Sequence, residues 1–91
     1  MAQRIASRKE ILRLNNGQTG PLLLCLEPLG EQVEMVPGQT YEVITVGSDE
    51  GSMEVIFEAS KVIVYGWNNS DSAVFHDGHQ VVGLNLDEAS S

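Results

Sequence analysis

The segment from Cys25 to Val46 has the sequence CLEPLGEQVEMVPGQTYEVITV and decides the fold class. It holds the end of one apolar strand and two further strand-like runs, which two groups of turn residues separate. Pro28 and Gly30 end the first strand, because proline cannot donate to a strand ladder and glycine turns easily. Pro37-Gly38 fits the centre of a type II turn, in which glycine supplies the positive φ. The segment therefore predicts consecutive strands of a small β-domain.

Strand-like runs and turns continue on both sides of this segment. The runs are Glu10–Asn15, Leu22–Glu27, Gln32–Val36, Thr40–Val46, Met53–Glu58, Lys61–Trp67, Ala73–His76 and His79–Leu86. Asp77-Gly78 between the last two is the strongest short hairpin signal in the chain. The chain thus has about seven or eight short strands, spaced roughly eight to twelve residues apart, and no convincing helix. This pattern indicates an all-β fold. We predict a small antiparallel β-sandwich, cupredoxin-like or Ig-like, or a partly open barrel.

Two runs carry specific predictions about the faces of their strands. The apolar residues of Leu22–Glu27 are continuous, which predicts a central strand covered on both faces. The run Met53–Glu58 has the cleanest alternation in the chain, with Met53, Val55 and Phe57 on one face and Glu54, Ile56 and Glu58 on the other.

The chain of 91 residues is long enough for one domain with a single core. We expect an N-terminal tail over 1–8, one sandwich domain over 9–86 and a C-terminal tail over 87–91. A single cysteine rules out an intramolecular disulfide. The N-terminus lacks the apolar core of a secretory signal, and the longest apolar run, Leu22 to Leu26, is too short to span a bilayer. A cytoplasmic protein without a membrane partner is expected.

The net charge of −8 is unevenly distributed along the chain. The first 13 residues carry four of the five cationic side chains against one glutamate, a net charge of +3. The remaining residues carry twelve acidic side chains against Lys61, a net charge of −11. An acidic body of this kind repels nucleic acid and permits a basic protein partner. It also serves to keep a protein soluble.

Three motifs resemble a group of small uncharacterised bacterial all-β proteins. They are LEPLG at Leu26–Gly30, PGQTYEV at Pro37–Val43 and VYGW at Val64–Trp67, in an order that these proteins share. The resemblance covers about two thirds of the chain, from Leu12 to Trp67. It implies a fold, and it carries no activity to this sequence.

A more distant resemblance is to cupredoxin-like sandwiches. Their copper site needs a cysteine that is closely followed by histidine and methionine, whereas Cys25 is followed by Leu26, Glu27 and Pro28. The resemblance therefore implies the scaffold without copper, and we expect no cofactor. Cys25 itself lies in the apolar run LLLCLE and is expected to pack as a small buried hydrophobe.

An apolar stripe is the first candidate site. Tyr65 and Trp67 alternate with Val64 and share a face with Ile63, and Ile56 of the preceding run is expected beside them. If the valines face the core, these side chains form an exposed interface for a protein partner or a homo-oligomer. The alternatives are that the strand is covered on both sides, or that Trp67 folds over the open end of the sandwich.

His76 and His79 form the second candidate, a weak metal site. They flank the Asp77-Gly78 turn, so a two-residue hairpin places them directly opposite each other. Two imidazoles and a carboxylate suit zinc, copper or nickel, but a structural zinc site needs four ligands. The alternative is a pair of exposed turn histidines.

Catalysis has little support in the sequence. Asp71, Ser72 and His76 are the residue types of a hydrolase triad, but they lack a nucleophile elbow and an oxyanion loop. We therefore expect a non-catalytic binding or assembly module that acts through protein contacts. In one version of this hypothesis, the contact is between two copies of the chain in a homodimer. The alternatives are an acidic inhibitor or immunity-type protein that neutralises a basic partner, and a weak metal-binding protein that uses the histidine hairpin.

Overall fold

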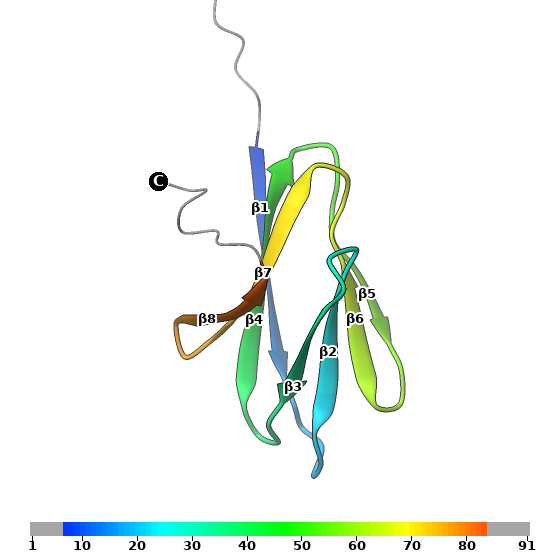
Figure 1. Cartoon of the computed structure of the whole chain (residues 1–91), viewed down its shortest axis with the longest axis vertical. Coiled ribbons are helices and arrows are strands. Elements are labelled where there is room, and N and C mark those ends of the chain that lie inside the picture. Colours follow the sequence, from blue (N-terminus) through cyan, green and yellow to red (C-terminus); the bar gives the residue numbers. More distant parts are fainter. Residues whose placement is uncertain (1–6, 84–91) are drawn as a thin grey trace, which may run out of the picture.

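The computed structural model describes residues 7–83 and shows two four-stranded sheets packed face to face (Figure 1). One sheet has the strand order β1-β4-β7-β8 and the other has the order β3-β2-β6-β5. The strands are β1 (Ser7–Asn15), β2 (Leu22–Glu27), β3 (Glu31–Met35), β4 (Thr40–Ser48), β5 (Glu54–Phe57), β6 (Lys61–Tyr65), β7 (Ser70–His76) and β8 (His79–Gly83). The predicted all-β sandwich is thereby confirmed, and the two sheets do not close into a barrel. Within residues 7–83 no helix is long and apolar enough to cross a membrane.

The sheets are not wholly antiparallel. The first sheet is antiparallel throughout, but in the second sheet β2 and β6 run parallel, with Cys25 opposite Ile63. Period-two alternation fixes which side chains share a face and carries no information on the direction of the neighbouring strand. The expectation of an antiparallel sandwich therefore needs this correction at one pair of strands.

The described ends of the domain differ slightly from the expected bounds. β1 begins at Ser7, inside the segment 1–8 that was expected to form a tail. Its first residue lies opposite Ser48 of β4. Residues 1–6 and 84–91 lie outside the described residues, and with them the expected end of the domain at 86 and the expected C-terminal tail.

Alternating residues of both sheets form the core between them. Leu24 and Leu26 of β2 meet Val43 of β4 and Val74 of β7, and each is at most 1% exposed. Burying a side chain of this size stabilises the fold by roughly 1.5–3 kcal/mol. Leu14, Met35, Val62 and Val64 belong to the same cluster. The core thus draws on the inner face of each sheet, as the alternation predicts.

Two predicted turns are confirmed by their backbone geometry. Gly38 has a φ of 79°, and the Gln39 N–H donates to the Val36 carbonyl at 3.1 Å, as a type II turn requires. Asp77 and Gly78 have φ values of 53° and 79°, which fit the type I′ turn of a two-residue hairpin. These turns set the register of the strands that they join.

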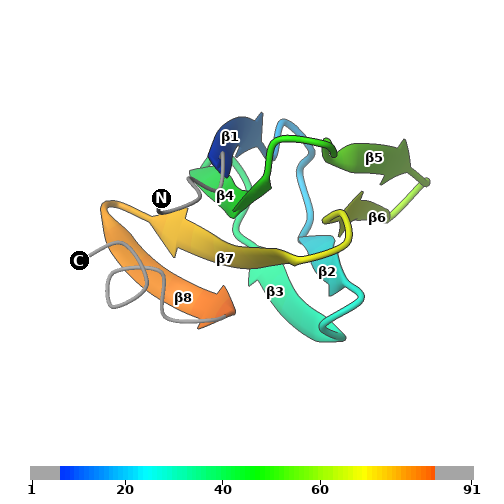
Figure 2. The same ribbon diagram turned by 90° about the horizontal axis from the view of Figure 1, so that it is seen from above.

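One prediction about a buried strand is wrong, and one inward-facing side chain is exposed. β2 is central in its sheet, but only its inner face is covered by the second sheet, because the described fold has two layers. Phe57 is 70% exposed although it lies opposite buried Val62 on the inner face. Phe57 is the last residue of the edge strand β5. The two sheets diverge on the side of β5 (Figure 2), so the opposing sheet does not cover a side chain that points inward there.

Candidate functional site

The outer face of the β3-β2-β6-β5 sheet carries a group of apolar side chains. Val62 and Val64 of β6 are buried in the core, so Ile63 and Tyr65 between and after them point outward. The strand register places Ile63 between Cys25 of β2 and Ile56 of β5. Leu23 of β2 is the next residue of this face. We call Leu23, Cys25, Ile56, Ile63 and Tyr65 the outer-face cluster.

The cluster is partly open to solvent. Ile56 is 45% exposed and Tyr65 is 36% exposed, while Ile63 is half-buried between its cross-strand neighbours. Cys25 is only 6% exposed, so it is packed as predicted, but on the outer face rather than in the core between the sheets. The structure thus brings together three of the four residues of the predicted stripe and adds Leu23 and Cys25 to them.

Trp67 does not belong to this cluster. β6 ends at Tyr65, and the Trp67 N–H donates to Ser70 Oγ at 2.9 Å in the turn before β7, so strand alternation no longer sets its direction. The indole Nε1–H donates to the Ser48 carbonyl at 2.9 Å. The indole also packs against Gly51, where a Cβ atom would overlap the ring. Trp67 thus corresponds to the alternative in which it folds over the end of the sandwich.

Acidic side chains flank the cluster. Tyr65 lies between Glu27 and Glu54 in the register, and Leu23 lies between Glu34 and Lys61. The ammonium of Lys61 is 3.7 Å from the carboxylate of Glu58 and is therefore already paired. The outer face thus has an apolar centre and a rim on which glutamate outnumbers lysine.

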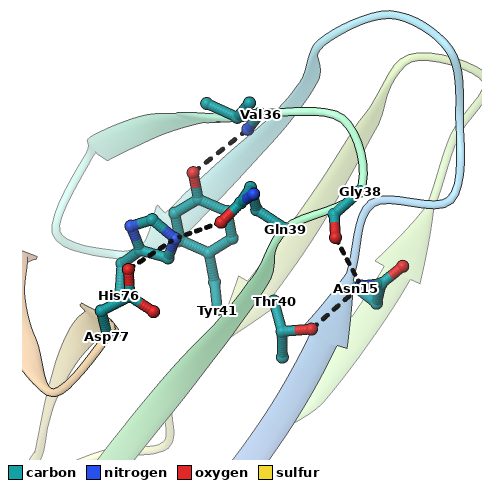
Figure 3. A network of polar contacts seen from close by, with 8 residues as sticks. All are labelled: Asn15, Val36, Gly38, Gln39, Thr40, Tyr41, His76 and Asp77. Atoms are coloured by element: carbon teal, nitrogen blue, oxygen red, sulfur yellow. Dashed lines mark hydrogen bonds and ion pairs between the residues drawn. The ribbon is translucent and has the colours of Figure 1, made fainter.

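The second candidate pair occupies the β7–β8 hairpin, where His76 and His79 are direct cross-strand partners as predicted. The His76 ring stacks on Tyr41, with ring centroids 4.3 Å apart, and its Nε2 is 3.1 Å from Gln39 Oε1 (Figure 3). Its remaining close contact is a carboxylate oxygen of Asp77 at 3.7 Å. His79 is exposed. His76 is thus engaged in contacts that join the hairpin to β4 and to the turn before it.

We expect the two histidines to differ in their contribution to stability. His76→Ala removes the Tyr41 stack and the Gln39 contact and should lower the free energy of unfolding by about 1–1.5 kcal/mol. His79→Ala should change it by less than about 0.5 kcal/mol, because the side chain is exposed. Urea denaturation measures both. Equal losses, or stabilisation of the parent protein by zinc that either substitution abolishes, would instead support a metal site.

Two sets of candidate residues lie within residues 7–83: the possible metal ligands and the serine of the hydrolase-triad types. No cluster of three or more histidine, cysteine, aspartate or glutamate side chains in that range could hold a metal ion. Ser72 is the serine among the residue types of a hydrolase triad. It is 5% exposed, and its Oγ forms a hydrogen bond of 2.8 Å with Thr45 Oγ1 inside the sandwich. Its hydroxyl therefore serves the packing of β4 on β7.

A cavity of about 490 Å³ lies beside β1, at a place where no sequence motif indicates a site. Glu10 is its structural anchor, because Oε1 accepts the Met53 N–H at 2.8 Å and Oε2 accepts Arg8 Nε–H at 2.9 Å. These bonds tie β1 to the chain that leads into β5. The Met53 N–H, and to a lesser extent Arg8, lower the pKa of the Glu10 carboxyl.

Glu10 should make the protein sensitive to acid. A carboxyl whose pKa is lowered by folding contributes stability above its unfolded pKa and loses it as the pH falls through the folded pKa. We expect Glu10→Gln to lower the melting temperature at neutral pH and to reduce the further loss in acid. Thermal unfolding from neutral pH to below the ordinary glutamate pKa measures this. A constant difference between parent and variant across that range would contradict it.

Comparison with protein family models, with curated proteins and with solved structures finds no match.

Proposed function

We propose that the protein is a non-catalytic binding module that contacts a basic protein partner through the outer-face cluster. The observation that carries this proposal is an apolar row on a sheet face that no further layer of the described chain covers. The row crosses three strands and runs from buried Cys25 through half-buried Ile63 to exposed Ile56. Exposed apolar side chains that gather on one face and have a polar rim are typical of protein interfaces. Tyr65 adds an aromatic side chain, of the kind that often dominates binding energy.

The rim favours a basic partner over a second copy of the chain. Glu27, Glu34, Glu54 and Glu58 surround the cluster, whereas Lys61 is the one cationic side chain among these neighbours. Two copies docked through this face would bring two acidic rims together and repel each other. Lysine and arginine side chains around an apolar centre would complement the rim.

Capture experiments with matched variants test the proposal. Ile56→Asp adds a charge to the cluster, and Val81→Asp on β8 is its control, because the two parent side chains are 45% and 47% exposed. The parent protein is immobilised and exposed to a fractionated set of basic proteins at low and at high salt. We expect salt-sensitive binding that Ile56→Asp reduces at least about tenfold and Val81→Asp leaves unchanged. Equal binding by both variants, or a parent protein that dimerises through this face, would reject the proposal.

The acidic rim also favours a second candidate, an inhibitor or immunity-type protein that neutralises a basic enzyme. The contact surface would be the same, and the difference lies in its consequence for the partner. If the captured protein is an enzyme, adding the parent chain should lower its activity and Ile56→Asp should not. If the activity of the enzyme is unchanged at a saturating concentration of the parent chain, the protein binds the enzyme but does not inhibit it.

A further inference from the structure

The sandwich is closed along one side and open along the other (Figure 2). β3 and β8 contact each other at the closed side, whereas the described residues give no comparable set of contacts between β1 and β5. Both β1 and β5 are edge strands, so each has one strand neighbour in the described sheets. The cavity of about 490 Å³ lies between these two edges.

The lining of the cavity shows how it lies on β1. Five consecutive residues, Arg8 to Leu12, line it, although successive side chains of a strand point to opposite faces. Five in a row can line one cavity only if it runs along the edge of the strand, where backbone N–H and C=O groups lie. Met53 and Val55 form the opposite wall, and Val55 lies opposite buried Val64 on the inner face of its sheet.

We propose that this cavity binds an extended segment of a partner protein, which carries acidic side chains and adds as a further strand to β1. The edge of β1 that no other described strand pairs with offers the hydrogen-bonding groups that such a strand requires. Alternate side chains of the segment would pack on Met53 and Val55, which themselves contact the core. β1 has nine residues against four in β5, so it offers the longer ladder.

The charge of the cavity selects the segment. Three of the four cationic side chains of residues 7–83 lie on β1, and Arg8 and Lys9 line the cavity itself. Arg8 is paired with Glu10, whereas Lys9 is exposed and forms no ion pair with any residue in the described range. On a chain whose net charge is −8, this edge is the place where an acidic segment meets positive charge.

The same charges disfavour three of the registers in which a second copy of β1 could be the occupant. Two antiparallel copies related by a two-fold axis must place some residue opposite itself. The registers centred on Lys9 and Glu10 set like charges face to face, and the register centred on Ile11 sets Lys9 opposite Arg13 of the other copy. Like charges directly opposite each other destabilise a strand pair.

Synthetic peptides test the proposal directly. The probe is a short peptide in which valine alternates with glutamate, and the controls replace glutamate by lysine or carry backbone N-methyl groups along one edge. We expect the glutamate peptide to shift the amide NMR signals of Arg8 to Leu12. Lys9→Glu should weaken its binding about tenfold and should strengthen binding of the lysine peptide. Lys61→Glu, on the other sheet, should change neither.

The N-methylated peptide separates strand addition from simple charge attraction, because it keeps its charges and loses backbone donors. It should bind at least about tenfold more weakly than the parent peptide. Retained binding of this peptide, equal affinity for the lysine peptide, or signal shifts confined to β3 or β8 would overturn the proposal. Self-association of the chain that Lys9→Glu abolishes would identify a second copy as the occupant and would overturn it as well. None of these outcomes depends on binding at the outer-face cluster, so the two proposals can fail independently.

Discussion

Asn16→Ala is expected to lower the free energy of unfolding by about 3 kcal/mol, one of the largest effects of any polar substitution in the described chain. Asn16 is fully buried. Its Nδ2 donates to the carbonyls of Gly20 and Met35 at 3.0 and 2.9 Å, and its Oδ1 accepts the Gln18 N–H at 2.9 Å. Alanine removes all three hydrogen bonds. It leaves the carbonyl of Met35, which is itself fully buried, without the donor that Asn16 provides.

The backbone of Asn16 adds to this role. Its N–H donates to the Gln39 carbonyl at 3.0 Å, and its carbonyl accepts the Gly38 N–H at 2.7 Å. The β1–β2 connection and the β3–β4 turn are therefore joined through one residue. A loosened Asn16 should disturb both, which is why the expected loss exceeds that of a typical single hydrogen bond.

Asn15 provides the matched control for this prediction. It is the same residue type, it is exposed, and its Nδ2 donates to Thr40 Oγ1 at 2.9 Å and to the Gly38 carbonyl at 3.3 Å (Figure 3). Because water can replace these partners, Asn15→Ala should cost less than about 1 kcal/mol. Urea denaturation of the two variants measures the difference. Losses of equal size would show that burial of the Asn16 amide is not what holds the two turns together.

The two asparagines also show where prediction from the sequence ends. Asn15-Asn16-Gly17 correctly indicates a break between two strands, because these residue types are common in turns. Neither asparagine has a positive φ, however, and Asn16 is used for its amide group. Which of two neighbouring asparagines is buried depends on a turn some twenty residues away, and no local pattern contains that information.

The candidate surfaces follow the same rule. Alternation within β6 predicts that Ile63 and Tyr65 face outward, because the two buried valines fix the inner face. The prediction fails at Trp67, where the strand has ended. At Phe57 alternation sets the direction of the side chain, but it does not give burial, because the opposing sheet does not reach that far. The cavity beside β1 was missed altogether, since it depends on the packing of two strands about forty residues apart.

Gly47→Ala is expected to lower the free energy of unfolding by about 2 kcal/mol through overpacking. A Cβ atom at Gly47 would lie 2.6 Å from Ser70 Cβ, 2.8 Å from Ser70 Cα and 2.8 Å from the Asn69 carbonyl oxygen. Two of these three atoms belong to the backbone at the start of β7, so no side-chain rotation relieves the overlap. Thermal unfolding measures the loss. The strand-like run predicted from the sequence ends at Val46, whereas β4 continues to Ser48, because the absence of a side chain at Gly47 lets β7 approach.

Gly20→Ala is the control for this substitution. A Cβ atom there would meet no other atom within 4 Å, and Gly20 has no positive φ. Alanine should therefore leave stability unchanged or raise it by about 0.4–1 kcal/mol, through the smaller entropy of the unfolded chain. If both variants lost the same stability, the close approach of β7 to β4 would not be the cause.

Gly47→Ala also separates the two proposed surfaces, because Gly47 lies opposite Arg8 in the β1–β4 register. A displaced Gly47 should shift the part of β1 that lines the cavity, and the glutamate peptide should bind more weakly at a temperature where the variant is still folded. The outer-face cluster lies on the other sheet and has no register partner in β4, so capture of a basic protein should be unaffected. Parallel loss of both activities would mean that the two sheets respond as one unit, and parallel retention would mean that the β1 edge tolerates the shift.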